Sequence, residues 1–488
     1  MSLRRAEEYI ASLRDGRIVY FRGRRVPDVT EHPVLRTAIE HAAIDYFMAH
    51  DPATRELAVV TDPQTGEEVS RYFVLPRCAE DLLLRSRLIE ASCRRGGTLV
   101  VLIKEIGTDA LFALHIIAHA MDRQLGTGYL ERVRAYYEYC KRNDLALAVA
   151  QTDVKGDRSR GPAEQPHPDY YVRVVERRSD GIILRGAKVH TSCSMNANEI
   201  IVLPTRSMRE EDRDYAVACA VPVNSPGLKL FVSAYGTSGD TPVENPIEHP
   251  ISARHRMMES LTVFDDVFVP WERVFLCEEW QFAGPLALTF VDFHRFTAIS
   301  YKLPLVDLLV GAGALLADYN GVLGATHVRD KLVRLAAYAE TLRGLTHQAA
   351  YACTFQDIGD GQIAVPNTLL VNVAKLHFAE GYHRAVALVQ DLAGGLVVTG
   401  PGAEDLESPE VRPYLDRYLG GRAGVSALDR LRAMNLVCDL TASDFGGYQE
   451  VLAIQAEGSI EAEKLAIARA YDLKRAMDYA KELAGIEA

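Results

Sequence analysis

The sequence predicts an α+β fold in three consecutive parts: a helical N-terminal domain over residues 1–148, a central antiparallel β domain over 149–282 and a C-terminal helical bundle over 283–488. The period of the apolar residues predicts this division, because it is helical in the first and last parts and close to two in the middle. The strand-like runs also follow one another without intervening helices, which is typical of an antiparallel sandwich or barrel and not of a βαβ domain.

Each part is predicted from its own segments. In the first part, apolar residues recur at helical spacing over 34–48, 108–122 and 129–141. The middle part contains runs of strand composition at 170–176, 182–189, 199–204, 214–222, 228–233 and 261–269. Helical patterns return at 303–318, 327–352, 366–392 and 461–486. The length of 488 residues is enough for roughly two to four structural units.

Composition and missing motifs argue against several classes of protein. The net charge of −12 gives no general attraction for nucleic acid or for an anionic membrane, and no run of about 18 apolar residues indicates a membrane span. The eight cysteines form no CxxC pair and the N-terminal residues have no apolar signal core, so we expect a cytoplasmic protein with reduced thiols. The sequence also lacks GxGxxG after a strand, GxxxxGK[ST], HExxH and GxSxG. Any bound nucleotide cofactor must therefore be held in another way.

Several segments resemble one flavoprotein family along nearly the whole chain. They are 12–33, 151–159, 171–176, 186–190, 267–275, 318–321 and 391–395. Together they resemble the 4-hydroxyphenylacetate 3-hydroxylase family, which contains reduced-flavin-dependent phenol hydroxylases and 4-hydroxybutyryl-CoA dehydratase, and most of them resemble the dehydratase branch. The order of helices, strands and helices is also that of acyl-CoA dehydrogenases, in which the flavin lies between sheet and bundle.

The resemblance implies FAD as cofactor and indicates three groups of residues that contact it. They are Gln151, Thr152, Asp153, Lys155 and Arg158 in the first loop, His190, Thr191 and Ser192 at a strand end, and Gln390, Gly394 and Gly395 after a helix. The hydroxyl, carboxylate and ammonium groups of the first loop suit a flavin edge or ribityl chain, although a charged, capped turn has the same composition.

The diglycine turn resembles a turn that holds the FAD pyrophosphate across a subunit interface. Two glycines allow backbone N–H groups to approach phosphate, although a plain glycine helix cap has the same pattern. A shared flavin site implies a homotetramer.

The sequence departs from both branches of the family at the active site. The dehydratase branch binds a [4Fe–4S] cluster through three cysteines and a histidine, and the matching positions here are Val101, Glu105, Tyr301 and His294. Iron–sulfur clusters require thiolates, so we expect no cluster and no other metal. In the hydroxylase branch an Arg, a Tyr and a His orient the phenol. Here Tyr129 matches the Tyr, whereas Leu125 and Val149 occupy the other two positions.

Three residues remain as candidates for catalysis: His294, Glu259 and Lys302. A histidine is suited to removing a proton next to a thioester, and a buried glutamate can share that task. Each of the three also has a purely structural interpretation as a buried residue with satisfied hydrogen bonds.

We therefore expect an FAD-dependent oxidoreductase or isomerase that acts on a small acyl-CoA thioester. The first alternative is a two-component monooxygenase that hydroxylates a phenol and receives reduced flavin from a reductase. The second is a flavin-binding protein without catalysis.

Overall fold

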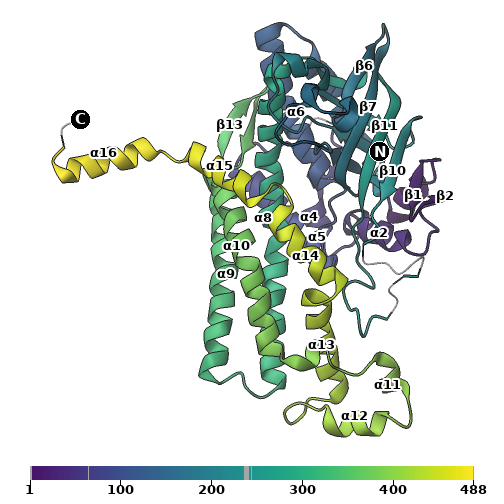
Figure 1. Ribbon diagram of the computed structural model, residues 1–488, viewed down its shortest axis with the longest axis vertical. Coiled ribbons are helices and arrows are strands. Elements are labelled where there is room, and N and C mark those ends of the chain that lie inside the picture. The colour runs from purple at the N-terminus through teal and green to yellow at the C-terminus, as the bar shows by residue number, and fades with distance from the viewer. Residues whose placement is uncertain (1–2, 64, 236–240, 243–244, 487–488) are drawn as a thin grey trace.

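The computed structural model describes residues 3–63, 65–235, 241–242 and 245–486, and it confirms the predicted order of helices, strands and helices. Three long helices, α8 (Trp280–Tyr319), α9 (Thr326–Tyr351) and α10 (Thr368–Ala393), form the bundle. In Figure 1 the strands lie at the upper right, and the bundle lies beside them and extends below.

The N-terminal part is built around α6 (Glu105–Leu125), a helix that is buried on nearly all sides. The other helices are α1 (Ala6–Ser12), α2 (Leu35–Ala42), α3 (Ile44–Met48), α4 (Arg55–Ala58), α5 (Ala79–Arg95) and α7 (Tyr129–Arg142). Four short strands were not predicted, because three residues are too few to show a period: β1 (Val19–Phe21), β2 (Arg24–Val26), β3 (Val59–Thr61) and β4 (Glu68–Ser70). Of these, β1 and β2 join the large sheet of the central part.

Two sheets form the central part, one of six strands in the order β2-β1-β10-β11-β7-β6 and one of four strands in the order β12-β9-β8-β5. Its strands are β5 (Leu147–Ala150), β6 (Arg173–Arg177), β7 (Gly181–Ser192), β8 (Glu199–Val202), β9 (Val217–Pro222), β10 (Leu228–Val232), β11 (Glu259–Pro270) and β12 (Val274–Cys277). Most neighbours are antiparallel, as predicted, but β1 pairs with β10 and β5 with β8 in parallel. The two longest strands, β7 and β11, lie side by side, and their ends position the candidate site.

The C-terminal part continues beyond the three long helices. The hairpin of β13 (Thr354–Asp357) and β14 (Gln362–Val365) joins α9 to α10. After α10 come α11 (Ala403–Glu407), α12 (Arg412–Tyr418), α13 (Ala427–Thr441), α14 (Asp444–Gln455), α15 (Ile460–Ala470) and α16 (Leu473–Ala484).

Three predicted helices differ from the sequence prediction. The predicted helix 34–48 is divided at Ala43 into α2 and α3. The predicted helix 303–318 is the second half of α8. The first half was not predicted because α8 contains Pro285 and Pro304, and proline normally interrupts a helix. The predicted helix 461–486 is two helices. Asp472 accepts a hydrogen bond from Arg475 N and so caps a new helix, α16, which is a common role of aspartate.

Helix α8 is long enough to cross a membrane, and an 18-residue window of it is apolar enough, when length and composition alone are considered. In the structure, 61% of that window is buried inside the protein. Helices α5, α6, α9 and α10 pack against α8, so its apolar composition is that of the central helix of a bundle.

Candidate active site

The first loop predicted to contact flavin lies beside the strand end predicted to contact it. Val189 N, in β7, donates a hydrogen bond of 2.8 Å to Thr152 O. The loop 151–155 and the strand end 190–192 are therefore neighbours, although the sequence separates them by more than thirty residues. The structure thus brings together two of the three predicted contact groups.

A buried ion pair holds this loop in place. The Asp153 carboxylate lies 2.8 Å from Lys188 Nζ, and both side chains are 2% exposed. Lys188 also donates to the backbone oxygens of Gln151 and Leu203, and Asp153 accepts from Val172 N. Asp153 is fully engaged inside the protein, so its observed contacts position the loop.

Other polar groups of the predicted flavin site have no partner among the described residues. The Thr191 hydroxyl is buried and has no hydrogen-bond partner there. The Lys155 ammonium forms no ion pair of 4.0 Å or less there, and burial, followed by the nearby Arg158, lowers its pKa. His190 has a φ of 55°, and partial burial of its ring, followed by the charge of Lys155, lowers its pKa. An orphaned buried hydroxyl near the unpaired Lys155 ammonium fits a bound ligand with carbonyl and phosphate oxygens.

Glu259 begins β11 and pairs with Ser192 at the end of β7. Paired residues of antiparallel strands share a face, so the two side chains lie on the same side of the sheet. One carboxylate oxygen accepts a hydrogen bond of 2.8 Å from the Tyr448 hydroxyl, and the other is buried without a partner among the described residues. Burial raises the pKa of Glu259 to about 7, so its carboxyl group can exchange a proton near neutral pH.

The second candidate, His294, is oriented by a buried carboxylate. Asp109 in α6 accepts hydrogen bonds from Arg85 (2.8 Å) and Thr297 (3.1 Å). Its other oxygen lies 3.4 Å from His294 Nδ1, and the imidazole stacks on Phe290 with ring centroids 5.2 Å apart. A carboxylate at Nδ1 favours the tautomer with the proton on that nitrogen and leaves Nε2 as the basic nitrogen.

Lys302 belongs to a buried ionic cluster. Its ammonium lies 3.0 Å from the Tyr301 hydroxyl and 3.0 Å from the Glu457 carboxylate, and Tyr301 also hydrogen-bonds to Glu457. Lys375 and Glu463, 3.1 Å apart, lie close to this group. Burial lowers the pKa of Lys302 and raises that of Glu457. These contacts fit the structural interpretation of Lys302 and equally a positioning role beside a ligand.

The sequence did not indicate Asp109, Tyr448 or Glu457 as partners of the candidate residues. Asp109 left a weak signal, since it is a carboxylate within the apolar pattern of α6. Tyr448 and Glu457 left none, because they lie more than 150 residues from the groups that they contact.

Comparison with known proteins identifies the family. Residues 5–276 match the family model described as 4-hydroxyphenylacetate 3-hydroxylase N terminal, and residues 283–485 match the model of its C terminal. The chain belongs to the 4-hydroxyphenylacetate 3-hydroxylase family. The resemblance found in the sequence is thereby confirmed, and the known relatives in this family are enzymes.

Similar proteins come from both branches of the family. The chain is 32% identical to 4-hydroxybutyryl-CoA dehydratase/vinylacetyl-CoA-Delta-isomerase of Clostridium aminobutyricum, with 99% of each chain covered. It is 30% identical to the oxygenase component of 4-hydroxyphenylacetate 3-monooxygenase of Thermus thermophilus, with 92% of this chain and 90% of the relative covered.

Solved structures from both branches share its fold. An archaeal 4-hydroxybutyryl-CoA dehydratase from N. maritimus superposes with a TM-score of 0.93, at 31% identity, over 100% of this chain and 96% of that one. The oxygenase component of 4-hydroxyphenylacetate 3-monooxygenase, complexed with FAD, superposes with a TM-score of 0.89 at 26% identity, over 98% of each chain.

The positions that the resemblance assigns to cluster cysteines do not fit an iron–sulfur cluster. Val101 is fully buried and has no donor atom, and the Tyr301 hydroxyl is bound to Glu457. Glu105 lies near the Asp45 carboxyl group, and burial raises the pKa of both. Cys93 is the nearby thiol, and burial raises its pKa and keeps it protonated.

The third predicted flavin group lies apart from the other two. Gln390 donates to Thr441 O (3.0 Å), and Gly394 adopts a φ of 81° at an exposed turn. In the part of the chain that the structure describes, no hydrogen bond or ion pair joins this turn to the loop 151–155. In Figure 1, α10 ends at the lower end of the bundle, whereas β7 lies in the upper part.

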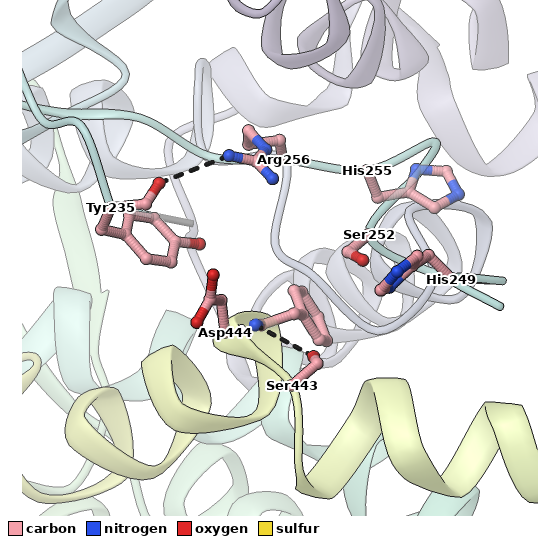
Figure 2. A pocket seen from close by; sticks show the side chains of 8 residues that line it. Tyr235, His249, Ser252, His255, Arg256, Ser443 and Asp444 are labelled. Atoms are coloured by element: carbon pink, nitrogen blue, oxygen red, sulfur yellow. Dashed lines mark hydrogen bonds between the residues drawn. The ribbon is translucent and has the colours of Figure 1, made fainter. Parts of the chain in front are cut away.

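A small cavity lies one aromatic ring away from Glu259. It measures about 60 Å³, and Figure 2 shows the side chains of Tyr235, His249, Ser252, His255, Arg256, Ser443 and Asp444 around it. Tyr235 stacks on Tyr448 with ring centroids 4.5 Å apart, and Tyr448 binds Glu259. Pockets for cofactor-sized ligands measure about 300–1,000 Å³, so this cavity is not large enough to be the flavin site.

Proposed function

We propose that this protein is an FAD-dependent oxidoreductase or isomerase of a small acyl-CoA thioester that works without an iron–sulfur cluster. The observation that supports this most is Glu259, a buried carboxyl group with a pKa of about 7 and one unpartnered oxygen. It lies at the strand end where the family resemblance predicts the flavin. Such a group is suited to proton transfer at a carbon next to a thioester.

FAD would be held by two groups of residues from one chain and one group from another. The loop 151–158 and the strand end 190–192 would contact the isoalloxazine and ribityl parts. The exposed turn of Gln390, Gly394 and Gly395 would contact the pyrophosphate of a neighbouring subunit, which implies a homotetramer. When bound, FAD supplies an acceptor for a hydride or an electron.

The protein's own residues would move the protons. His294 presents Nε2 as the base, because Asp109 occupies the Nδ1 side of the ring. Glu259 exchanges its proton with the substrate near neutral pH, while Tyr448 fixes the orientation of its carboxylate. Neither residue polarises a departing hydroxyl group as the iron–sulfur cluster of the dehydratase branch does. We therefore propose that dehydration is slow or absent.

The alternative is a phenol monooxygenase that works with a flavin reductase, and relatives of both kinds are similar to this chain. One observation argues against it. The Tyr129 hydroxyl, which matches the phenol-binding Tyr of the hydroxylase branch, donates to Glu279 at 3.1 Å. Leu125 is exposed, and Val149 is an apolar residue buried within β5. A phenolate would therefore meet neither a cation nor an imidazole at these positions.

The decisive experiment compares the two substrate classes on FAD-loaded protein. Small acyl-CoA thioesters should bleach the flavin absorbance under anaerobic conditions or exchange their α-proton in deuterated water, and the corresponding free acids serve as controls. If thioesters do neither, while reduced flavin and oxygen hydroxylate a phenol, the monooxygenase replaces our proposal. If the protein binds FAD and acts on neither class, it is a flavin-binding protein without catalysis.

A further inference from the structure

Arg256, in the segment that leads into β11, is a buried cation without a counter-charge. The residue is only 7% exposed, and its guanidinium has no carboxylate within 4.0 Å among the residues that the structure describes. Its hydrogen bond to Tyr235 O is long, at 3.4 Å. A guanidinium carries five N–H donors, and an unpaired charge is unfavourable in a protein interior. A buried arginine in this state is therefore suited to binding an anion.

The guanidinium lies at the edge of the small cavity shown in Figure 2. The cavity measures about 60 Å³. A single water needs roughly 10–15 Å³ on the same measure, so there is room for a group of about five heavy atoms. A phosphate ion has this size, whereas a nucleotide does not fit.

The wall of the cavity opposite Arg256 is held rigidly by a different carboxylate, Asp439 in α13. Asp439 accepts hydrogen bonds of 2.8 Å from Ile251 N and Ser252 N, and one of 2.7 Å from Ser252 Oγ. Its Oδ1 also lies 3.6 Å from His249 Nδ1. Asp439 thus fixes the loop to the helix, and with these partners it is not the counter-charge of Arg256.

The remaining polar groups around the cavity leave donors free for a ligand. The Tyr235 hydroxyl forms no hydrogen bond with the described residues. Ser443 caps α14 by accepting from Phe445 N and Gly446 N, so the positive end of the helix dipole lies at this cavity. Asp444 is the carboxylate that lines it, but the side chain is exposed and water screens its charge.

We propose that this cavity is a phosphate-binding site in which Arg256 is the principal partner of the anion. A guanidinium and a phosphate form short, charge-assisted hydrogen bonds in a two-pronged geometry, and the Tyr235 hydroxyl supplies a further donor. The phosphate is either the free ion or the phosphate monoester of a bound CoA, and the chemistry of recognition is the same. The site does not require the acyl-CoA activity proposed above, because inorganic phosphate alone can test it.

A bound phosphate would also steady the candidate active site. The Arg256 guanidinium lies 5.9 Å from the centre of the Tyr235 ring, which stacks on Tyr448 at 4.5 Å. Tyr448 in turn donates to Glu259. An anion that fixes Arg256 therefore restrains the pair of rings that orients the Glu259 carboxyl group.

The test titrates inorganic phosphate into the full-length, FAD-loaded protein by calorimetry, at constant ionic strength set with chloride. The wild type should bind phosphate, and Arg256→Gln should bind it at least about tenfold more weakly, because a charge-assisted hydrogen bond is lost. The matched control is Arg254→Gln, which removes the same charge two positions away at an exposed residue. Its affinity should stay within about twofold of the wild type, because solvent screens an exposed charge.

Thermal unfolding provides a second measurement that also guards against a misfolded variant. Phosphate should raise the Tm of the wild type and of Arg254→Gln, but not that of Arg256→Gln. Without phosphate, Arg256→Gln should be at least as stable as the wild type, because it removes an unpaired buried charge. A variant that is less stable or unfolded under these conditions would show that Arg256 already has a counter-charge, and would overturn the proposal.

CoA and 3′-dephospho-CoA distinguish the two sources of the phosphate. If CoA binds at least about tenfold more tightly, and Arg256→Gln abolishes the difference, the site takes the 3′-phosphate of CoA. Equal binding of the two, together with binding of inorganic phosphate, assigns the site to the free ion. A wild type that binds neither phosphate nor CoA, or an Arg256→Gln variant that binds them as tightly as the wild type, would refute the site.

Discussion

Replacing Glu259 with glutamine separates the titration of this buried carboxyl group from its shape. Burial raises its pKa from 4.5 to about 7, although the Tyr448 hydrogen bond and the nearby Ser192 side chain act in the opposite direction. The folded protein therefore binds this proton more tightly than the unfolded chain does. It follows that this group makes the free energy of unfolding fall as the pH rises from about 4.5 through about 7. The difference in pKa corresponds to roughly 3 kcal/mol.

Glutamine does not titrate, but it retains an oxygen that accepts the Tyr448 hydrogen bond. The free energy of unfolding of Glu259→Gln should therefore exceed that of the wild type by up to about 3 kcal/mol at pH 8, and by less than about 1 kcal/mol at pH 5. Urea unfolding followed by circular dichroism at one protein concentration measures both differences. Glu482→Gln, at an exposed position, is the control and should show no pH-dependent change.

An equal difference at both pH values would refute this reasoning. It would mean that the Glu259 carboxyl group is hydrated in solution and titrates as an ordinary glutamate. The proposed proton exchange at neutral pH would then lose its physical basis. The same variant should also lose turnover, because a general acid or base contributes about 10²–10⁴-fold in rate.

Three further predictions test the neighbouring groups. His294→Ala should retain FAD binding, seen as flavin absorbance, but lose about 10²–10⁴-fold in rate, and a loss below about tenfold would make His294 a structural residue. Asp109→Asn should lower the stability by about 3 kcal/mol or more, because the buried Arg85 guanidinium then lacks a counter-charge. It should also alter the pH–rate profile, which a change in stability alone does not do, and an unaltered profile would exclude Asp109 as the residue that orients His294. Elemental analysis after anaerobic purification should find less than one iron per chain, and about four would contradict the assignment of Val101, Glu105 and Tyr301 as non-ligands.

The long elements of this fold are predictable from sequence, and the short ones are not. Helices α6, α7, α9 and α10 and strands β7 and β11 contain enough residues for their apolar period to be read. Strands β1 and β2 have three residues each, and the pair joins the large sheet because β10, about 200 residues away, pairs with β1. The division of 461–486 into α15 and α16 has a local cause, the capping residue Asp472, which the apolar period did not reveal.

The sequence by itself determined the order of the three parts and the family, and from the family it indicated FAD and the residues Glu259, His294 and Lys302. These properties follow from local pattern and from residue identity at motif positions. Only the tertiary structure decided what each candidate contacts: Tyr448 for Glu259, Asp109 for His294 and Glu457 for Lys302. The reason is that a buried polar group must find partners, and in a folded chain these come from elements that are distant in sequence. The pKa of Glu259 is set by that burial, so it is a property of the fold and not of the residue.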